Sequence, residues 1–198
     1  MSKVITISRE FGSGGREIGF RLAEKLGIPF YDKEIISMAA EDSNISEDVF
    51  HRHDEVIGNK ERIDHDYVSV NPFSLYEVPV SDQVFMAQSQ IIKKLAQEGP
   101  CVFVGRCADQ ILKDDNQLLR VYIYASDMED RIKRIKKNKN LSQREALDRI
   151  AYKDRQRRDY YDFYTGHEWG KMENYDICLN TSVLSEEECV ELLMKLAE

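Results

Sequence analysis

The sequence predicts an α/β fold in which helices cover both faces of a parallel β-sheet. Short apolar runs that suit buried strands alternate along the chain with longer segments of helical apolar spacing. A glycine-rich turn joins the first apolar run to the first helical segment, and neither an internal repeat nor a linker is visible. The length of 198 residues matches one domain, so we expect a single unit with three layers.

The expected strands are short apolar runs bounded by turn residues. The run at 101–104, for example, lies between Pro100 and Gly105 and is apolar throughout, which suits a parallel strand buried on both faces. Strands are expected at residues 4–7, 28–31, 101–104, 119–125 and 177–179. Because helical segments separate them, right-handed crossovers should place them side by side in one parallel sheet.

The expected helices follow from apolar residues that recur every three or four positions. In the helix after the glycine-rich turn, Ile18, Leu22 and Leu26 share one face. The last helix opens at a capping box formed by Ser185 and Glu188. Further helices are expected near residues 34–41, 84–97, 127–139 and 142–160.

Composition excludes several classes of protein. No apolar run approaches the roughly 18 residues that a membrane helix needs, and the first residues lack the apolar block of a signal peptide. The chain is 42% hydrophobic, which suffices for a core at this length. Its four cysteines form no CxxC pair and are expected as buried thiols. We therefore expect a globular protein of the cytoplasm that binds no membrane.

Charge is unevenly distributed along the chain. The formal net charge is −8, yet residues 131–158 hold 12 basic and 3 acidic side chains, a balance of +9 against −17 elsewhere. This basic segment is either a solvated helix face or a clamp for a small polyanion such as a nucleotide phosphate. A nucleic-acid groove is disfavoured, because basic patches in such proteins are usually broad. The expected partners are therefore small-molecule nucleotides and not nucleic acid.

The turn at residues 8–18 lies between the first expected strand and the first expected helix. Open parallel sheets bind ligands at such places, outside the carboxyl ends of their strands. Gly12, Gly14 and Gly15 permit positive φ and a close approach of the backbone, so several amides can point at one anion. The positive end of the helix adds to this effect. The turn predicts a phosphate site; the alternative is a tight connection that needs only small residues.

The turn departs from the phosphate loop GxxxxGK[ST] of nucleotide-binding enzymes. Glu10 stands at the first glycine, Arg16 replaces the lysine, and Glu17 stands where a serine or threonine would follow. Arg16 can bring a cation to the β- and γ-phosphates, although its planar fork is not equivalent to an ammonium group. Magnesium would lose its usual hydroxyl ligand, so Glu17, a water molecule or another acid would have to serve.

Six stretches, spread over nearly the whole chain, have a distinctive combination of residues. The opening ones are ITISREFGSGGREIG and FRLAEKLGIPFYDKEII. The later ones are VGRCAD from residue 104, RIKR from 131, YYDFYTG from 160 and NYDICLNTS from 174. Together they resemble the cytidylate kinase-like family, the nucleoside monophosphate kinase branch of the P-loop NTPase fold. The resemblance implies a parallel five-stranded sheet with a helical lid and a monophosphate-binding insert. It also implies ATP-dependent phosphorylation of CMP or dCMP, with magnesium but no identified protein ligand for it.

By this resemblance the chain is one kinase-like domain with three parts. The core comprises residues 1–41, 84–126 and 174–198. The insert comprises residues 42–84, a polar stretch that prolines interrupt, and the basic lid region comprises residues 127–173. The oligomeric state is left open.

The resemblance also implies roles for individual residues. The loop that holds ATP is matched by Gly12, Ser13, Gly14, Gly15 and Arg16, with Glu17 next to it. The place of the adenine end is matched by Asn180 and Thr181. Positions near the acceptor are matched by Asp32, Arg106 and, in the lid, Asp154. The arginines expected around the transferring phosphoryl group are Arg16 and Arg106, with Arg131, Arg134, Arg155 and Arg158 of the lid region.

Several alternatives stay open for these residues. Asp32 could cap the helix that begins two residues later, and Arg106 could pair with Asp109. Arg131 and Arg134 could pair with acids one turn earlier on their own helix. The aromatic residues between 160 and 169 are expected to pack under the lid rather than to stack on a base. His51, His53 and His65 lie among acids, but their spacing fits no compact metal motif, so a solvated insert is expected.

Two further functions compete with a CMP kinase. The insert is the part of the chain that matches the family least, so a kinase for another small phosphate acceptor is one alternative. The other is a nucleotide-binding regulatory protein with little turnover, because the loop lacks both the lysine and the hydroxyl of the usual motif.

Overall fold

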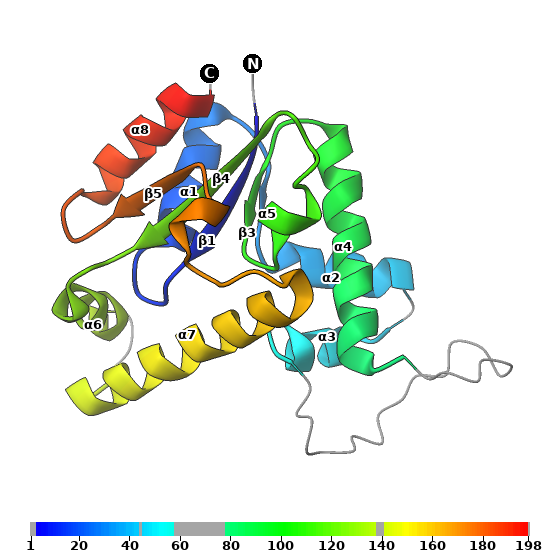
Figure 1. Cartoon of the computed structure of the whole chain (residues 1–198), viewed down its shortest axis with the longest axis horizontal. Helices are drawn as coiled ribbons and strands as arrows, with labels where there is room; N and C mark the ends of the chain where they lie inside the picture. The colour runs from blue at the N-terminus through cyan, green and yellow to red at the C-terminus, as the bar shows by residue number, and fades with distance from the viewer. Residues whose placement is uncertain (1–2, 44, 58–77, 138–140, 198) are drawn as a thin grey trace, which may run out of the picture.

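The computed structural model of the chain contains one sheet of five parallel strands in the order β2-β3-β1-β4-β5 (Figure 1). The structure describes residues 3–43, 45–57, 78–137 and 141–197. The strands are β1 (Val4–Arg9), β2 (Phe30–Tyr31), β3 (Val102–Val104), β4 (Leu118–Tyr124) and β5 (Ile177–Asn180). The predicted fold class is confirmed, and every strand ends within two residues of its predicted bounds.

Helices connect and cover the strands. They are α1 (Gly15–Leu26), α2 (Glu34–Ser43), α3 (Glu47–His53), α4 (Val80–Glu98), α5 (Ala108–Ile111), α6 (Met128–Lys137), α7 (Gln143–Thr165) and α8 (Glu186–Ala197), with a short 3-10 turn, η1 (Met172–Asn174). No described helix is long and apolar enough to cross a membrane. The capping box before α8 is confirmed, because the Glu188 amide donates to Ser185 Oγ at 3.2 Å and the Ser185 amide donates to Glu188 Oε2 at 2.8 Å.

Two helices extend four or five residues beyond a predicted end. Helix α4 begins at Val80, four residues early, because buried Val80 extends its apolar face and the buried Gln83 side-chain amide donates to the Val78 carbonyl at 2.7 Å. Helix α7 continues five residues beyond 160 because its tyrosines pack inward. It ends at Gly166, which adopts a φ of 71°.

The strands bury alternate side chains on the two faces of the sheet. Ile7 and Val121 point to one face, where α1 and α8 pack. Phe103 of β3 points to the other face, where it meets α2 and α4. Figure 1 shows the same arrangement, with α1 and α8 on one side of the strands and α4 on the other. The result is the predicted three-layer architecture.

An aromatic cluster fills the space between β4 and α7. It contains Tyr122, Tyr160, Tyr161, Trp169 and Tyr175, all buried. The expectation that the aromatic residues between 160 and 169 pack beneath α7 is therefore confirmed for Tyr160, Tyr161 and Trp169, whereas Phe163 is 49% exposed.

All five strands end at the same edge of the sheet, because they are parallel. Helix α7 lies across this edge, at the bottom of Figure 1, while both chain ends lie at the top. Helices α6 and α7 form most of the predicted lid region, and α3 falls in the predicted insert. The prediction for His65 lies outside the described residues. The edge beneath α7 is where charged side chains from distant parts of the chain meet.

Candidate active site

A glycine loop at residues 10–14 connects β1 to α1. Gly12 and Gly14 adopt φ values of 83° and 86°, a region that strains side chains with a Cβ. At Gly12 a Cβ would also lie 3.0 Å from the carbonyl oxygen of Arg131. The buried hydroxyl of Ser13 donates to the Glu10 carbonyl at 2.9 Å and closes the turn. Positions 12 and 14 of the loop therefore favour glycine over any residue with a Cβ.

Several amides of this loop and of the first turn of α1 have no acceptor among the residues that the structure describes. Within the described part of the chain, the amides of Gly12, Gly14, Arg16 and Glu17 donate to neither a carbonyl nor a side chain. They lie at the start of α1, where the helix dipole is positive. Such a set of amides suits the oxygens of a phosphate group.

Arg131 and Asp154 hold the first part of the loop. The buried Arg131 guanidinium donates to the carbonyl of Phe11, from Nε at 2.9 Å and from Nη2 at 2.7 Å. The Asp154 carboxylate accepts from the Phe11 amide at 2.7 Å and also pairs with Arg131. This buried pair therefore positions the loop against α7. Contacts of either residue with a substrate stay predictions.

Arg134 and Thr181 hold two further carbonyls of the loop. Arg134 donates to the Gly12 carbonyl at 3.3 Å, and the Thr181 hydroxyl donates to the Ser13 carbonyl at 2.8 Å. Asn180 is bonded through its side-chain amide to the turn that follows β4. The end of β5 thus lies against the glycine loop, and contact of Asn180 and Thr181 with adenine stays a prediction.

Arg16 and Glu17 turn away from the loop. The Arg16 side chain, 56% exposed, donates from Nε to Asp32 Oδ2 at 2.7 Å. Glu17 pairs with Arg21 on the surface of α1 at 3.0 Å. Asp32 does not cap α2, because its two carboxylate oxygens accept from Arg16 and Arg106 instead.

Three arginines near the middle of α7 have different surroundings. Arg155 and Arg158 are exposed, and the guanidinium of Arg158 lies 5.8 Å from the ring centre of Trp169. The Arg157 side chain is only 14% exposed and points to the edge of the sheet. Its guanidinium lies 5.7 Å from the ring centre of Phe11 and donates to a backbone carbonyl at the end of β1.

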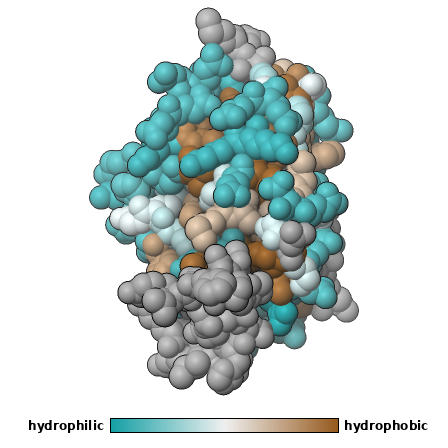
Figure 2. Space-filling model, turned by 90° about the vertical axis from the view of Figure 1, so that its right-hand side faces the viewer, coloured by the Kyte–Doolittle hydropathy of each residue, from teal (hydrophilic) through white to brown (hydrophobic). Residues whose placement is uncertain are grey.

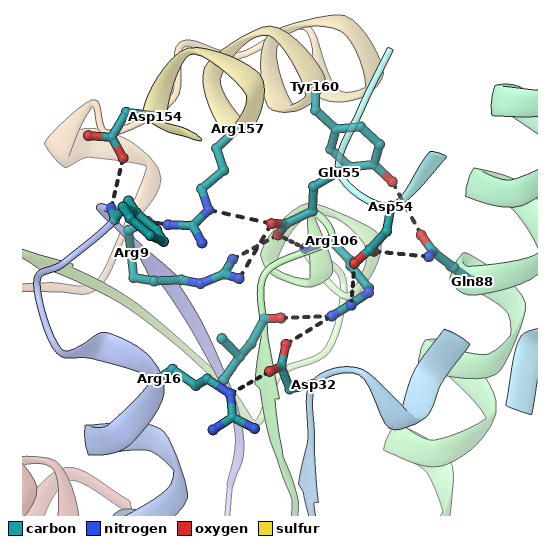
Figure 3. A network of polar contacts seen from close by, with 12 residues as sticks. Arg9, Arg16, Asp32, Asp54, Glu55, Gln88, Arg106, Asp154, Arg157 and Tyr160 are labelled. Carbon is teal, nitrogen blue, oxygen red and sulfur yellow. Dashed lines mark hydrogen bonds and ion pairs between the residues drawn. The ribbon is translucent and has the colours of Figure 1, made fainter. Parts of the chain in front are cut away.

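Arg9, Arg106 and Arg157 surround one carboxylate, that of Glu55, and we call these three residues the arginine cage (Figure 3). Arg9 Nη1 lies 2.7 Å from Glu55 Oε1, and Arg157 Nε lies 3.4 Å from Oε2. The backbone amide of Arg106 donates to Oε1 at 3.1 Å. The cage combines the end of β1, the turn after β3 and the middle of α7, which the sequence separates widely.

Arg106 is the most deeply buried member of the cage. It donates to Asp32 Oδ1 at 3.3 Å and to Asp54 Oδ2 at 2.9 Å. Its Nε is buried and has no acceptor among the described residues. It does not pair with Asp109, which accepts from the Tyr161 hydroxyl at 2.6 Å. A ligand oxygen could satisfy the remaining donor of Arg106.

Backbone strain concentrates at the cage. Among the described residues, the non-glycine ones with positive φ are Glu55, Arg106 and Cys107, at 54°, 56° and 56°. All three line the same small cavity. Gly105, directly before Arg106, has a φ of 78°, and a Cβ there would collide with the Glu55 carboxylate and the Arg9 guanidinium. Backbone strain of this kind often occurs at active sites and ligand-binding sites.

The charges in the cage shift one another's pKa. Burial alone would raise the pKa of Glu55, but Arg9, Arg157 and Arg106 outweigh it and hold this pKa far below its ordinary value. The pKa of Asp32 is likewise lowered, because Arg9 and Arg106 outweigh its burial. Burial, together with the charge of Arg9, lowers the pKa of Arg157 to about 10. The carboxylates of Asp32 and Glu55 are therefore ionised and the guanidinium groups remain charged at neutral pH, whereas burial raises the pKa of Asp54.

The sequence interpretation missed Arg9, Asp54 and Glu55. Arg9 had a usable signal, because it ends the first strand immediately before the glycine turn. The two acids had been grouped with His51 and His53 as a solvated or metal-binding stretch. No group of described residues is arranged to hold a metal ion. Nothing in the spacing of Asp54 and Glu55 indicates that they meet arginines from other segments.

A second cavity, of about 470 Å³, lies next to the arginine cage. Cys107 lines both this cavity and the small cavity at the cage. Phe85 of α4 and Tyr164 of α7 stack within it, with ring centres 4.0 Å apart. The side-chain amides of Gln90 and Gln110 also line it. Figure 2 shows the side of the molecule on which α4 lies, where hydrophobic patches are set among hydrophilic residues. The volume falls in the range of small-molecule sites.

Comparison with known proteins gives a family and a fold. The model of the cytidylate kinase-like family matches residues 4–183. An uncharacterized protein from Eubacterium ventriosum has a similar solved structure, with a TM-score of 0.75, 25% identity and 98% of each chain covered.

Shikimate kinases share the fold at lower identity. The enzyme from Bacteroides thetaiotaomicron is 15% identical with a TM-score of 0.56, over 99% of this chain and 98% of that one. The enzyme from Aquifex aeolicus is 19% identical with a TM-score of 0.50, over 97% and 95%. No curated protein matches the chain in sequence.

Proposed function

Because the chain belongs to the cytidylate kinase-like family, we propose that it transfers the γ-phosphoryl group of ATP to a nucleoside monophosphate, with CMP or dCMP as the first candidates. The observation that carries this proposal is the shared edge of the sheet. There, the glycine-loop region, whose amides at Gly14, Arg16 and Glu17 have no acceptor among the described residues, directly follows Arg9, a member of the arginine cage. Two anionic substrates can therefore be held close together.

On the donor side, the glycine loop would bind the triphosphate of ATP. The free amides of Gly14, Arg16 and Glu17 would meet its β- and γ-oxygens at the positive end of α1. Asn180 and Thr181, which lie against this loop, would be near the adenine end. Arg16 and Arg134 are the nearest candidates to neutralise charge on the phosphates.

On the acceptor side, the arginine cage would bind the phosphate of the monophosphate. Arg106 is central to this assignment, since its Nε is buried and lacks an acceptor among the described residues. The neighbouring cavity would take the base, because stacked Phe85 and Tyr164 offer an aromatic face and Gln110 offers an amide to a base edge. This pairing of an anion site with an aromatic cavity favours a nucleotide acceptor.

The chemistry requires little covalent help from the protein. An oxygen of the acceptor phosphate attacks the γ-phosphorus as the bond to the β-phosphate oxygen breaks, and ADP leaves. The protein aligns the two phosphates, neutralises charge around the moving group and excludes water. Arg16 and Arg106 would neutralise this charge. Arg134, Arg155 and Arg158 of the predicted lid region are further candidates for the same role.

Magnesium would enter together with ATP rather than at a dedicated protein site. The described residues contain no cluster of metal ligands, and no hydroxyl follows Arg16. When bound, the ion neutralises charge on the triphosphate. A carboxylate such as that of Glu17 would have to turn towards the loop to contact it.

The test is to incubate the protein with ATP, magnesium and one acceptor at a time, and to measure ADP. The panel contains CMP, dCMP, UMP, AMP, the neutral nucleoside cytidine, and shikimate, whose kinases share the fold. ADP formation that depends on CMP or dCMP supports the proposal. Formation with another acceptor supports a different small-molecule kinase. Tight ATP binding without ADP across the panel supports the regulatory protein, which the altered loop sequence favours.

A further inference from the structure

The carboxylate of Glu55 is held as a ligand would be. It accepts from two guanidinium groups and a backbone amide, those of Arg9, Arg157 and Arg106, at 2.7, 3.4 and 3.1 Å (Figure 3). Its own segment, the turn after α3, contributes none of these donors. Guanidinium forks and backbone amides are the groups that proteins use to bind phosphate oxygens.

The cage has no room for a second anion while Glu55 is inside. The cavity lined by Glu55, Arg9, Arg106 and Arg157 leaves about 10 Å³ of free space, enough for one water molecule. The Glu55 side chain is itself only 16% exposed. Any ligand that uses these donors must therefore replace the carboxylate.

We propose that Glu55 is a specificity-determining residue: its carboxylate occupies the place of the acceptor's anionic group, and only an acceptor with a phosphate dianion displaces it. This inference rests on the proposed function for the identity of the ligand. The site itself is defined by the contacts of Glu55.

Charge decides which acceptor can replace Glu55. The connected cluster contains four guanidinium groups and three carboxylates, those of Arg9, Arg16, Arg106, Arg157, Asp32, Asp54 and Glu55. When the Glu55 carboxylate leaves, the excess of positive charge in this cluster is about two. A phosphate monoester carries about −1.5 to −2 at neutral pH and restores the balance. A carboxylate restores half of it, and a neutral hydroxyl restores none.

The backbone conformation of Glu55 makes the exchange of its carboxylate for a ligand phosphate reversible. Glu55 has a φ of 54°, a left-handed conformation that is unfavourable for a residue with a Cβ. The ion pairs of its carboxylate hold it there. Once a phosphate takes over these pairs, the Glu55 backbone can relax, which favours the displaced state. The cage binds a ligand only when the Glu55 carboxylate has left it. The measured association constant for an anion is therefore that of the vacated cage multiplied by the fraction of molecules in which the cage is vacated.

The experiment measures the affinity of inorganic phosphate for the wild type, Glu55→Gln and a matched control, Glu24→Gln. Glu24 is exposed on α1, so its substitution removes the same charge away from the cage. We expect Glu55→Gln to bind phosphate about tenfold more tightly than the wild type, and Glu24→Gln to bind like the wild type. Acetate, which supplies a carboxylate, should bind the three proteins more weakly than phosphate does.

A second variant guards against loss of folding. Glu55→Asp keeps the charge but shortens the side chain by one methylene, so its carboxylate cannot reach the three donors together. We expect a smaller increase in phosphate affinity, about threefold. Thermal melting with increasing phosphate gives an independent measure, since phosphate should raise the melting temperature of both Glu55 variants more than that of the wild type.

Equal phosphate affinity in the wild type, Glu55→Gln and Glu55→Asp overturns the inference, and so does an absence of phosphate binding in all three. Neither measurement needs turnover. A protein that forms no ADP but shows the expected order of phosphate affinities contradicts the proposed function alone. An active kinase whose Glu55 variants bind phosphate as the wild type does contradicts the inference alone.

Discussion

The glycine loop and the arginine cage lie at the same edge of the sheet but are built differently. The loop presents backbone amides, and its carbonyls are bonded to Arg131, Arg134 and Thr181. The cage presents side chains from three separate segments, and these are already paired with carboxylates: Arg9 and Arg157 with Glu55, and Arg106 with Asp32 and Asp54. The glycine loop, the proposed donor side, therefore has unpaired amides, whereas the arginine cage, the proposed acceptor side, is occupied by a carboxylate of the same chain.

This difference follows from what each anion site is made of. Backbone amides carry partial charges, and they can stay unpaired near a helix end at little cost in free energy. Full charges on clustered guanidinium groups repel one another and need counter-charges when they are partly buried. A cage of arginines without ligand therefore recruits carboxylates of the same chain, as Glu55, Asp54 and Asp32 show. Two anion sites of one protein can thus differ sharply in how ligands must compete for them.

The largest effect is expected from Gly105→Ala, which breaks the acceptor side. The new Cβ would collide with the Glu55 carboxylate and the Arg9 guanidinium, so the cage must deform. We expect kcat/KM for the acceptor to fall about 100- to 1,000-fold, the scale for loss of aligned charged donors. The control is Gly27→Ala, whose φ of 65° is also left-handed but whose Cβ would have no atom within 4 Å. It should cost about 1 kcal/mol of stability and leave turnover intact. Similar kinetic losses in both variants would contradict the cage assignment.

The next effect concerns the donor side. Asp154→Asn removes one of the two carboxylates that pair with the buried Arg131, since Glu10 Oε2 still lies 3.4 Å from Arg131 Nη1, and it weakens the bond to the Phe11 amide. We expect a loss of about 2 kcal/mol in the free energy of unfolding, because the buried guanidinium loses a charged hydrogen-bond partner and keeps only the Glu10 carboxylate. Chemical denaturation measures it, with Asp159→Asn, an exposed aspartate on the same helix, as the control. A loss below 1 kcal/mol in the free energy of unfolding would show that the pair of Arg131 and Asp154 does not stabilise the loop.

A smaller effect separates the two sides kinetically. Arg157→Gln removes one donor of the cage but leaves the loop carbonyls untouched. We expect KM for the acceptor to rise about tenfold, equivalent to about 1.4 kcal/mol, with KM for ATP within a factor of two of the wild type. Arg144→Gln, an exposed arginine of α7, should change neither value. Equal increases in both KM values would mean that the two sites are not separate.

The smallest effect is on the pH dependence of stability, and it has opposite signs on the two sides. Burial raises the pKa of Glu10, beside the loop, above its ordinary 4.5, so the folded protein takes up this proton first. As the pH falls towards 4.5, the wild type should therefore gain stability relative to Glu10→Gln. The cage lowers the pKa of Glu55, so the stability it adds is present above pH 4.5 and is lost below it. The stability advantage of the wild type over Glu55→Gln should accordingly shrink as the pH falls from 4.5 to 3. Thermal unfolding across this pH range measures the stability of the wild type relative to Glu10→Gln and relative to Glu55→Gln. It shows whether these two stability differences change in opposite directions.

The sequence predicted the geometry of the glycine loop better than that of the arginine cage, for physical reasons. The glycine loop is local: a strand, three glycines and a helix start lie within about a dozen residues, so spacing alone predicts their joint geometry. The same holds for the strands, the fold class and the capping box before α8. The cage depends on contacts between residues 9, 55, 106 and 157, and no periodicity encodes such contacts. In the sequence, Glu55 of the insert is therefore indistinguishable from a solvated charged residue. Only the folded structure shows that it lies among arginines.

The most direct test of this account is a crystal structure with a non-hydrolysable ATP analogue and CMP bound together. The account predicts the β- and γ-phosphates on the amides of Gly14, Arg16 and Glu17. It also predicts the CMP phosphate between Arg9, Arg106 and Arg157, with the Glu55 carboxylate moved out. A CMP phosphate bound elsewhere, with Glu55 still inside the cage, would contradict it.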